Sequence, residues 1–330
     1  MSIDKFVYLT RSDVAACDVS LARSLEISEQ TYSEHAKGNY EMPPKPGVHP
    51  STCPGAFHHA MPAYLPNSHA VGIKWVAVYG HNPKKYNCNS TSALMVLNDE
   101  ETGYPVAIME AGLITAIRTA NASAVSAKYL ARKDAKTVGM VGCGEMGRFT
   151  VRALLHVMPG LQEIKMYDLF PSMIDKLIEF VGPTHVKFTI CNSAEEAIRD
   201  SDIVATSAPL PVKDPVYKAE WVKKGALVLP VHCNGWPLEF LKKGAAKFVV
   251  DDWNQYHSYM FGPTKYYTED LEAPYAQLGE IINGVKPGRE NDEEIIINSN
   301  LGIALQDISL GFEVLKIAQE KGIGTELSLL

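Results

Sequence analysis

The sequence predicts an α/β protein in which a doubly wound parallel sheet is joined to a second, α+β domain. Three observations support this fold class. From Thr137 onward, strand-like and helical segments alternate, which is typical of a parallel sheet with helices on both faces. A glycine-rich turn joins the first strand and helix of that region. Before Gly112, strand-like segments are instead joined by turn residues, which is typical of antiparallel pairing.

Length and composition narrow the class of protein. The chain has 330 residues, enough for two domains, with 46% hydrophobic and 21% charged residues. A net charge of −7 argues against a nucleic-acid partner. No secretory signal and no apolar run of roughly 18 residues is visible. The six cysteines form no CxxC pair, which indicates free thiols in a reducing compartment. We therefore expect a soluble, cytoplasmic protein with no membrane partner.

The N-terminal part predicts a helical stretch, a loop and three strands. Apolar spacing predicts helix within residues 11–37, and frequent proline, histidine and glycine predict a loop with short extended pieces over residues 43–66. Turn residues at 98–103 predict an antiparallel hairpin. The predicted strands are 70–78, 92–97 and 106–110.

The remainder predicts an alternating domain between two long helices. The helices cover residues 113–132 and 301–321. The predicted domains are residues 1–125, residues 126–310, and a C-terminal helix, 311–330, that returns to the first domain because chain ends often lie close together. The strands of the alternating domain are 138–141, 164–167, 188–191, 203–206, 227–231 and 248–250.

A strand that ends at Val141 runs directly into a GxGxxG turn, and a helix follows. Gly142 permits the tight turn, Gly144 lets the backbone approach a pyrophosphate, and Gly147 allows close packing of helix on strand. Glu145 and Met146 begin the helix, where backbone N–H groups and the helix dipole favour phosphates. This context predicts a Rossmann-type dinucleotide site. A glycine turn that binds no nucleotide is the alternative.

The next strand ends in Asp168, where a carboxylate can accept hydrogen bonds from the adenosine ribose. The following Leu169-Phe170-Pro171 contains no arginine for a 2′-phosphate, so we expect NAD(H) and not NADP(H) as the cofactor. Thr206 and Ser207, at the end of a later strand, are assigned to the same cofactor site.

Three further stretches share one resemblance. They are residues 71–76 (VGIKWV), 113–120 (LITAIRTA) and 301–307 (LGIALQD). With the glycine turn, they resemble the ornithine cyclodeaminase/mu-crystallin family. The family includes cyclodeaminases, an alanine dehydrogenase and ketimine reductases. The resemblance implies a Rossmann domain, and a substrate-binding and dimerisation domain built from both chain ends, in a homodimer.

An α-amino or α-imino acid always presents a carboxylate, which needs cations at fixed positions. Arg118 can offer a bidentate fork, and Lys74, between Ile73 and Trp75 on a strand, is expected to be a partly desolvated ammonium. The resemblance places both cations at the substrate carboxylate, with Lys74 also the proton donor as an ammonium at neutral pH. The alternatives are an interdomain salt bridge for Arg118 and a solvated strand side chain for Lys74.

Two departures from the cyclodeaminase pattern bear on the reaction. Lys45 stands where relatives have an arginine that binds the substrate carboxylate. Asn234 stands where cyclodeaminases have an aspartate that acts as general base, and an amide cannot take a proton at neutral pH. His232 can substitute because its ordinary pKa is in the right range, or it is simply hydrogen-bonded at a strand end. Ser90 lies near the position of a substrate-site threonine.

Four histidines, His49, His58, His59 and His69, lack the spacing of metal ligands, so we expect no metal. His58 and His59 are instead expected to line the mouth of the substrate site.

These observations predict an NAD(H)-dependent oxidoreductase that acts at the α-carbon of a small amino acid or its imine. The first alternative is an ornithine-type cyclodeaminase that uses NAD catalytically and releases ammonia. The second is a crystallin-like protein that binds a small ligand without catalysis. The sequence does not name the side chain of the substrate.

Overall fold

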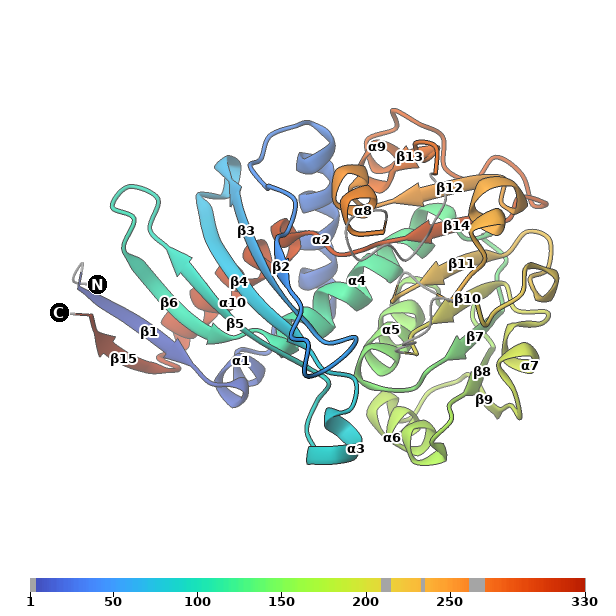
Figure 1. The fold of residues 1–330 in the computed structure, drawn as a ribbon, viewed down its shortest axis with the longest axis horizontal. Helices are drawn as coiled ribbons and strands as arrows, with labels where there is room; N and C mark the ends of the chain where they lie inside the picture. Colours follow the sequence, from blue (N-terminus) through green and yellow to red (C-terminus); the bar gives the residue numbers. More distant parts are fainter. Residues whose placement is uncertain (1–3, 209–214, 233–234, 261–270, 330) are drawn as a thin grey trace. The chain divides into compact units, whose positions relative to one another are not determined.

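The computed structural model describes residues 4–208, 215–232, 235–260 and 271–329 (Figure 1). The chain forms two compact units: unit 1 is Met1–Arg118 with Ile303–Leu330, and unit 2 is Thr119–Gly302. The sequence placed these boundaries near residues 125 and 310. The C-terminal helix predicted over 311–330 ends at Lys321, because Gly322 takes a positive φ of 64°, and strand β15 (Thr325–Ser328) follows. The first boundary lies inside the continuous helix α4 (Gly112–Leu130), so no loop marks its position in the sequence.

Unit 1 is built on a seven-stranded sheet with the order β15-β1-β6-β5-β4-β3-β2. The predicted hairpin is confirmed, because β5 and β6 pair antiparallel. The strands are β1 (Lys5–Leu9), β2 (Gly47–Val48), β3 (Phe57–Leu65), β4 (Ala70–Val78), β5 (Thr91–Asn98), β6 (Pro105–Glu110) and β15 (Thr325–Ser328). The helices of this unit, besides the start of α4, are α1 (Arg11–Cys17), α2 (Leu21–Ala36), α3 (Asn82–Tyr86) and α10 (Ala304–Lys321).

Two predictions for unit 1 were wrong in detail. The helical stretch 11–37 is two helices, because Asp18 takes a left-handed conformation (φ 50°) and Ser20 then caps α2. The loop expected around Pro62 is the long strand β3. Pro62 pairs with Ile73 of β4, while β2 pairs with β3 only near His58 and His59. At Pro62 the missing N–H therefore removes no hydrogen bond between β2 and β3.

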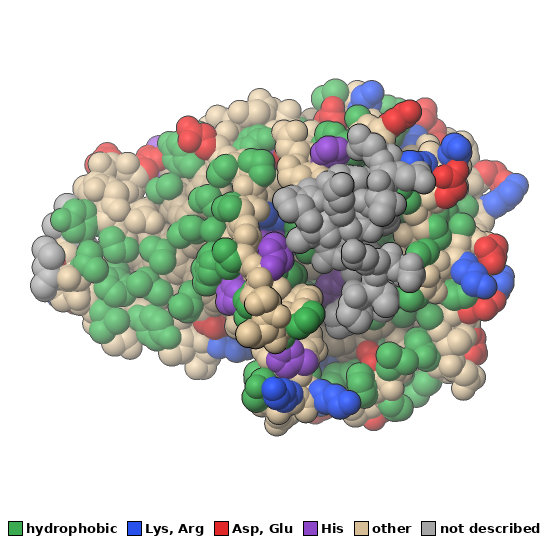
Figure 2. Space-filling model, viewed as in Figure 1, with side chains coloured by type: hydrophobic (Ala, Val, Ile, Leu, Met, Phe, Trp, Pro, Cys, Tyr) green, Lys and Arg blue, Asp and Glu red, His purple; other side chains and the backbone are tan. Residues whose placement is uncertain are grey.

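Helix α10 packs against β3, β4 and β5 and against α2. Its contact with the sheet is close, because a Cβ at Gly311 would lie 2.4 Å from the Met95 sulfur. The opposite face of the sheet is also apolar: Trp75 is 45% exposed and Leu94 is 50% exposed. Figure 2 shows hydrophobic side chains over the region where β1, β4, β5 and β6 lie in Figure 1.

Unit 2 contains an eight-stranded sheet with the order β13-β12-β14-β11-β10-β7-β8-β9, in which every described pair is parallel, as predicted. The chain runs from β7 outward to β8 and β9, then continues on the other side of β7 with β10. This reversal at β7 and β10 is the switch point where such sheets bind ligands. The strands are β7 (Thr137–Val141), β8 (Glu163–Tyr167), β9 (Lys187–Ile190), β10 (Ile203–Thr206), β11 (Leu227–Pro230), β12 (Lys247–Val250), β13 (Ala276–Gln277) and β14 (Ile296–Ser299). The helices are α5 (Glu145–Val157), α6 (Pro171–Val181), α7 (Ala194–Ile198), α8 (Trp253–Met260) and α9 (Leu278–Ile282), besides the end of α4.

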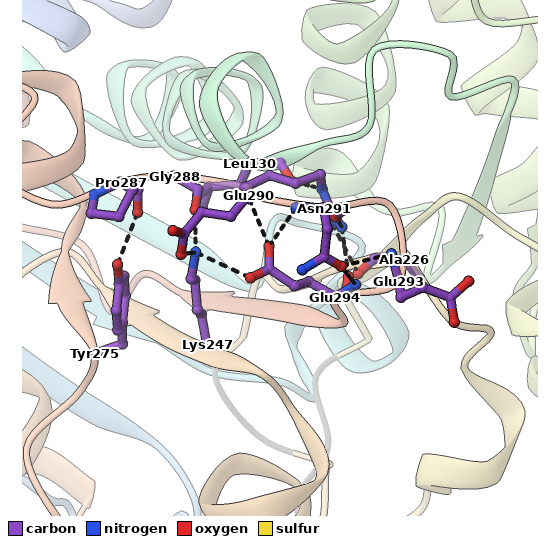
Figure 3. A network of polar contacts seen from close by, with 11 residues as sticks. Leu130, Ala226, Lys247, Tyr275, Pro287, Gly288, Glu290, Asn291, Glu293 and Glu294 are labelled. Atoms are coloured by element: carbon purple, nitrogen blue, oxygen red, sulfur yellow. Dashed lines mark hydrogen bonds and ion pairs between the residues drawn. The ribbon is translucent and has the colours of Figure 1, made fainter.

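A polar network around Lys247 ties β12 to the segment before β14 (Figure 3). The Lys247 ammonium lies 2.6 Å from a Glu290 oxygen and 3.2 Å from a Glu294 oxygen, and it lies 5.0 Å from the centre of the Tyr275 ring. It also donates to the carbonyl of Gly288. Lys247 is 4% exposed, so this network satisfies a buried charge.

Candidate active site

The structure brings Lys74 and Arg118 to one carboxylate. The Lys74 ammonium lies 2.7 Å from Oδ2 of Asp307, and Nε of Arg118 donates to Oδ1 of Asp307 at 3.0 Å. The side chains of Lys74 and Asp307 are both 0% exposed, and that of Arg118 is 11% exposed. The alternative of a solvated Lys74 is therefore wrong, and Arg118 forms its ion pair with a carboxylate of its own unit.

Three elements position these groups. Lys74 lies on β4, where alternate residues point to opposite faces: Lys74 is buried beside α10, and Trp75 points the other way. Arg118 is in the second turn of α4, whose start is fixed by Glu110, because this carboxylate accepts hydrogen bonds from the backbone of Gly112 at 2.8 Å and from the following residue. Asp307 comes from the first turn of α10. The site is thus assembled from three distant stretches of sequence.

Burial lowers the pKa of Lys74 to about 7, because a desolvated ammonium is disfavoured. Arg118 and Lys45 act in the same direction, and Asp307 opposes them. The expected ammonium, charged at neutral pH and partly desolvated, is thus corrected to a fully buried group that is only partly charged near neutral pH. Burial would raise the pKa of Asp307, but Arg118 and Lys74 outweigh it and hold this pKa below its usual range.

Lys45 adds positive potential around Lys74, and His59 is influenced by both lysines. Lys45, half-buried in the loop before β2, lowers the pKa of both Lys74 and His59. Burial, Lys45 and two further cations lower the pKa of His59 to about 3, so its imidazole is neutral. His58 lies on the opposite face of β3, where its ring stacks on Trp75 and its Nε2 lies 3.0 Å from the Tyr79 hydroxyl. The two neighbouring histidines therefore do not line one site together.

Other candidate residues are less closely connected to this cluster. Ser90 is half-buried in the loop before β5, where its carbonyl accepts a hydrogen bond from Tyr79 N at 2.7 Å. Burial lowers the pKa of His232 to about 4, although a hydrogen bond with the backbone of Ser207 acts to raise this pKa. This corrects the expected basicity, because such an imidazole is a weak base. Asn234 lies outside the described residues.

The glycine turn has the geometry that its sequence predicts. Gly142 has a φ of 93°, which favours glycine. A Cβ at Gly147 would lie 2.2 Å from the Gly142 carbonyl oxygen, so only glycine allows α5 to approach β7 this closely. A Cβ at Gly144 would meet no described atom within 4 Å, so the turn faces open space there. No side chain caps the N-terminus of α5, which begins with Glu145 and Met146.

Asp168 lies beside this turn, at the end of β8. Its Oδ2 accepts a hydrogen bond from Cys143 N at 2.7 Å, and its Oδ1 accepts one from Phe170 N at 2.9 Å. The carboxylate is half-buried and is anchored to the backbone of the glycine turn. Each oxygen retains a second lone pair with which it can accept a ligand hydroxyl.

Thr206 and Ser207 differ in how their hydroxyls are used. Thr206 Oγ1 accepts a hydrogen bond from Trp236 Nε1 at 3.2 Å, which gives this side chain a structural partner. The Ser207 hydroxyl is buried and has no hydrogen-bond partner in the part of the chain that the structure describes. A buried hydroxyl of this kind is suited to a ligand contact.

Sequence reasoning assigned no role to Asp307, Thr115 or His59 in the Lys74 cluster. Thr115 accepts a hydrogen bond from the Lys74 ammonium at 3.3 Å and donates one to the Ala111 carbonyl at 2.7 Å. One signal was available for Asp307: it is a lone carboxylate in an apolar segment of a predicted helix. Buried carboxylates usually have a charged partner.

The described residues contain neither a cluster of metal ligands nor a membrane-spanning helix. Nowhere in ranges 4–208, 215–232, 235–260 and 271–329 do three His, Cys, Asp or Glu side chains gather as metal ligands would. Within the same ranges, none of the helices has the length and apolar character needed to cross a bilayer.

Comparison with known proteins places the chain in a family. The pattern of the ornithine cyclodeaminase/mu-crystallin family matches residues 5–322. The nodulation efficiency protein NfeD of Rhizobium meliloti is 36% identical over 97% of this chain and 98% of its own length. Two solved structures are 32% identical. One is the Thermococcus litoralis Delta(1)-pyrroline-2-carboxylate reductase with NADH and L-proline (TM-score 0.87, covering 97% of this chain and 99% of that one). The other is an archaeal alanine dehydrogenase dimer with bound NAD (TM-score 0.86, covering 99% and 100%). The chain belongs to the ornithine cyclodeaminase/mu-crystallin family.

Proposed function

We propose that this protein is an NAD(H)-dependent oxidoreductase that transfers hydride to or from the α-carbon of a small amino acid or its imine. The observation that carries the proposal is the buried cluster of Lys74, Arg118 and Asp307, with the pKa of Lys74 lowered to about 7. A group with this pKa can give and take protons at neutral pH. The two relatives of known structure act on imino and amino acids with the same cofactor.

The glycine turn of unit 2 fits a dinucleotide. The open side of Gly144 and the uncapped start of α5 suit a pyrophosphate. Asp168 suits the ribose hydroxyls, and the buried hydroxyl of Ser207 suits a further polar contact. The nicotinamide supplies or accepts the hydride when the cofactor is bound.

In unit 1, Arg118 and Lys45 bind the substrate carboxylate. Arg118 uses Nε for Asp307. Its two terminal amino groups bond no other side chain in the part of the chain that the structure describes, so both remain for the substrate carboxylate. Lys74 gives its proton to the imine side of the substrate as the α-carbon is reduced, and takes a proton in the reverse reaction. Burial of Lys74 keeps water away from this transfer.

A panel of activity assays tests the proposal. We expect NADH to be consumed with cyclic or acyclic α-imino acids, and with 2-oxo acids plus ammonia. NADH should be preferred to NADPH by about tenfold, about 1.4 kcal/mol, because the Asp168 carboxylate beside the glycine turn suits the ribose hydroxyls and not a 2′-phosphate. Ammonia release from ornithine without net change in NADH would instead show the cyclodeaminase reaction. Ligand binding without either reaction would show a non-catalytic binder.

We also propose that the protein is a homodimer, joined through the open face of the unit 1 sheet. Trp75 and Leu94 are half exposed on neighbouring strands of this face, and a second copy would bury them. The alanine dehydrogenase with a similar fold is a dimer. Leu94→Lys should give a monomer in sedimentation velocity, whereas the control Val285→Lys, at a 66% exposed site of unit 2, should not. A dimeric Leu94→Lys protein would contradict this interface.

The described cysteines, Cys17, Cys53, Cys88, Cys143 and Cys191, are all free thiols. This supports the expected cytoplasmic location, where thiols stay reduced.

A further inference from the structure

Asp307 is the group on which the two cations of the site converge. Each of its oxygens contacts a different cation: Oδ2 lies 2.7 Å from the Lys74 ammonium, and Oδ1 accepts from Arg118 Nε at 3.0 Å. With the side chains of Lys74 and Asp307 0% exposed, little water screens these contacts. A shift of this one carboxylate would therefore move both cations.

The charges around Lys74 are unbalanced. Arg118, on α4, and Lys45, in the loop before β2, both disfavour its charged form. His59, on the adjacent strand β3, is coupled to Lys74 and is neutral. Asp307, on α10, is the only carboxylate among the described groups that act on Lys74. Without Asp307, the remaining charged neighbours, Arg118 and Lys45, would both disfavour the ammonium form of Lys74.

Asp307 is itself held in the ionised form. It lies in the first turn of α10, where the helix dipole stabilises negative charge, and Arg118 and Lys74 outweigh its burial. The carboxylate is therefore a fixed negative charge while Lys74 gains and loses its proton.

The contacts also account for the protons of Lys74. An ammonium has three N–H donors. One faces Asp307, and one is donated to Thr115 Oγ1 at 3.3 Å. Among the described residues no third acceptor is present, so one N–H remains for a substrate.

We propose that Asp307 is a positioning residue of the proposed reaction: its carboxylate holds the Lys74 ammonium and the Arg118 guanidinium in fixed positions and sets the charge that Lys74 carries. This inference rests on the proposed function for its kinetic consequences. Its electrostatic consequence, however, is a property of the free protein and can be measured without a substrate.

The first experiment follows the titration of Lys74 by NMR. The full-length protein is labelled with lysine carrying ¹³C at Cε, and the Lys74 signal is assigned by its absence from Lys74→Met. We expect Asp307→Asn to move the Lys74 titration to lower pH by about one unit or more, because the only opposing charge is removed. The matched control is Asp202→Asn, since Asp202 is also buried and lies 2.7 Å from Lys223 but belongs to unit 2. An unchanged Lys74 titration in Asp307→Asn would overturn the proposal.

The second experiment measures kcat/KM for imine reduction against pH in the same variants. We expect Asp307→Asn to shift the high-pH limb of the profile to lower pH by the same amount and to raise KM. Asp202→Asn should leave this limb at its wild-type pH. A loss of activity or stability without a moved limb would mean that Asp307 is only structural.

Asp307→Glu covers the case in which Asp307→Asn does not fold. The charge is kept but is displaced by one methylene. The high-pH limb of the kcat/KM profile should therefore stay within about half a pH unit of its wild-type position, while kcat/KM falls about fivefold or more. A wild-type kcat/KM in Asp307→Glu would overturn the positioning role. If the unmodified protein reduces no imino acid, the proposed function fails, and the NMR titration still decides the inference.

Discussion

In the part of the chain that the structure describes, each unit buries one lysine, and the two lysines are held differently. Lys74 of unit 1 is 0% exposed and shares its single carboxylate with Arg118. Lys247 of unit 2 is 4% exposed and contacts two glutamates and a carbonyl oxygen. Burial lowers the pKa of Lys74 to about 7, whereas for Lys247 the hydrogen bonds with Glu290 and Glu294 outweigh burial and raise the pKa. Burial alone therefore does not determine the charge of a lysine.

The difference separates a lysine suited to proton transfer from one suited to stability. A buried ammonium with enough acceptors is a structural cation across the whole neutral range. A buried ammonium that competes with a second cation for its acceptor is ready to lose its proton. The following predictions test this distinction.

The largest effect is expected for Lys74→Met. Loss of the proton donor should lower kcat for imine reduction by about 10²–10⁴-fold, the usual contribution of general acid catalysis. Steady-state consumption of NADH measures the change, and Lys247→Met is the matched control, with kcat expected within about twofold of the wild type. NADH binding should be unchanged in both. Less than about a tenfold loss in Lys74→Met would contradict the catalytic role.

Lys247→Met should instead destabilise the fold by about 2–3 kcal/mol, because Glu294 stays largely buried without its partner. The raised pKa of Lys247 means that its contribution is lost only as pH rises through the folded pKa, above the ordinary 10.5. The lowered pKa of Glu294 means that its contribution is lost only as pH falls below the ordinary 4.5.

The loss of stability in Lys247→Met should consequently be constant from about pH 6 to about pH 9. Urea denaturation at several pH values measures it. A loss that varies strongly across this range would mean that Lys247 titrates there, as Lys74 does, and the contrast between the two lysines would fail.

The pH dependence of the unmodified protein gives a third test. Reduction requires the charged form of Lys74, so kcat/KM should fall about tenfold per pH unit above about pH 7. Oxidation of the amino acid requires the neutral form, and its rate should rise through the same pH. Profiles of the two directions that do not mirror each other would exclude Lys74 as the titrating group.

The smallest effect is expected for Arg118→Lys. The charge is kept but the fork is lost, so KM for the substrate should rise about tenfold while NADH affinity stays the same. Titration of NADH by fluorescence is the control measurement. An unchanged KM would show that Arg118 serves only as the partner of Asp307.

The sequence predicted the parts of the molecule that depend on local patterns. The glycine turn, Asp168 and the parallel strands follow from residues close together in the chain, and the fold class was confirmed by the solved relatives. Strand β3 was missed because Pro62 and the other prolines of residues 43–66 are typical of loops, and the strand is compatible with Pro62 because its missing N–H interrupts no pairing with β2.

The ion cluster could not be derived in the same way. Lys74, Arg118 and Asp307 are far apart in sequence, and their contact depends on how α10 returns to the sheet. The lowered pKa of Lys74 is a result of that packing, so the sequence alone suggested a partly desolvated ammonium but not the full burial that lowers its pKa. The lowered pKa of His232 depends on burial in the same way.

The return of α10 and β15 to unit 1 has a consequence for biosynthesis. All of unit 2 emerges from the ribosome before residues 303–330, which complete unit 1. Until then β1 lacks its neighbour β15, and the inner face of the sheet lacks the helix that covers it. Exposed apolar strands of a nascent chain are prone to aggregate. The first 118 residues of unit 1 therefore complete neither their core nor the contact of Lys74 and Arg118 with Asp307 until the last part of the chain has been synthesised.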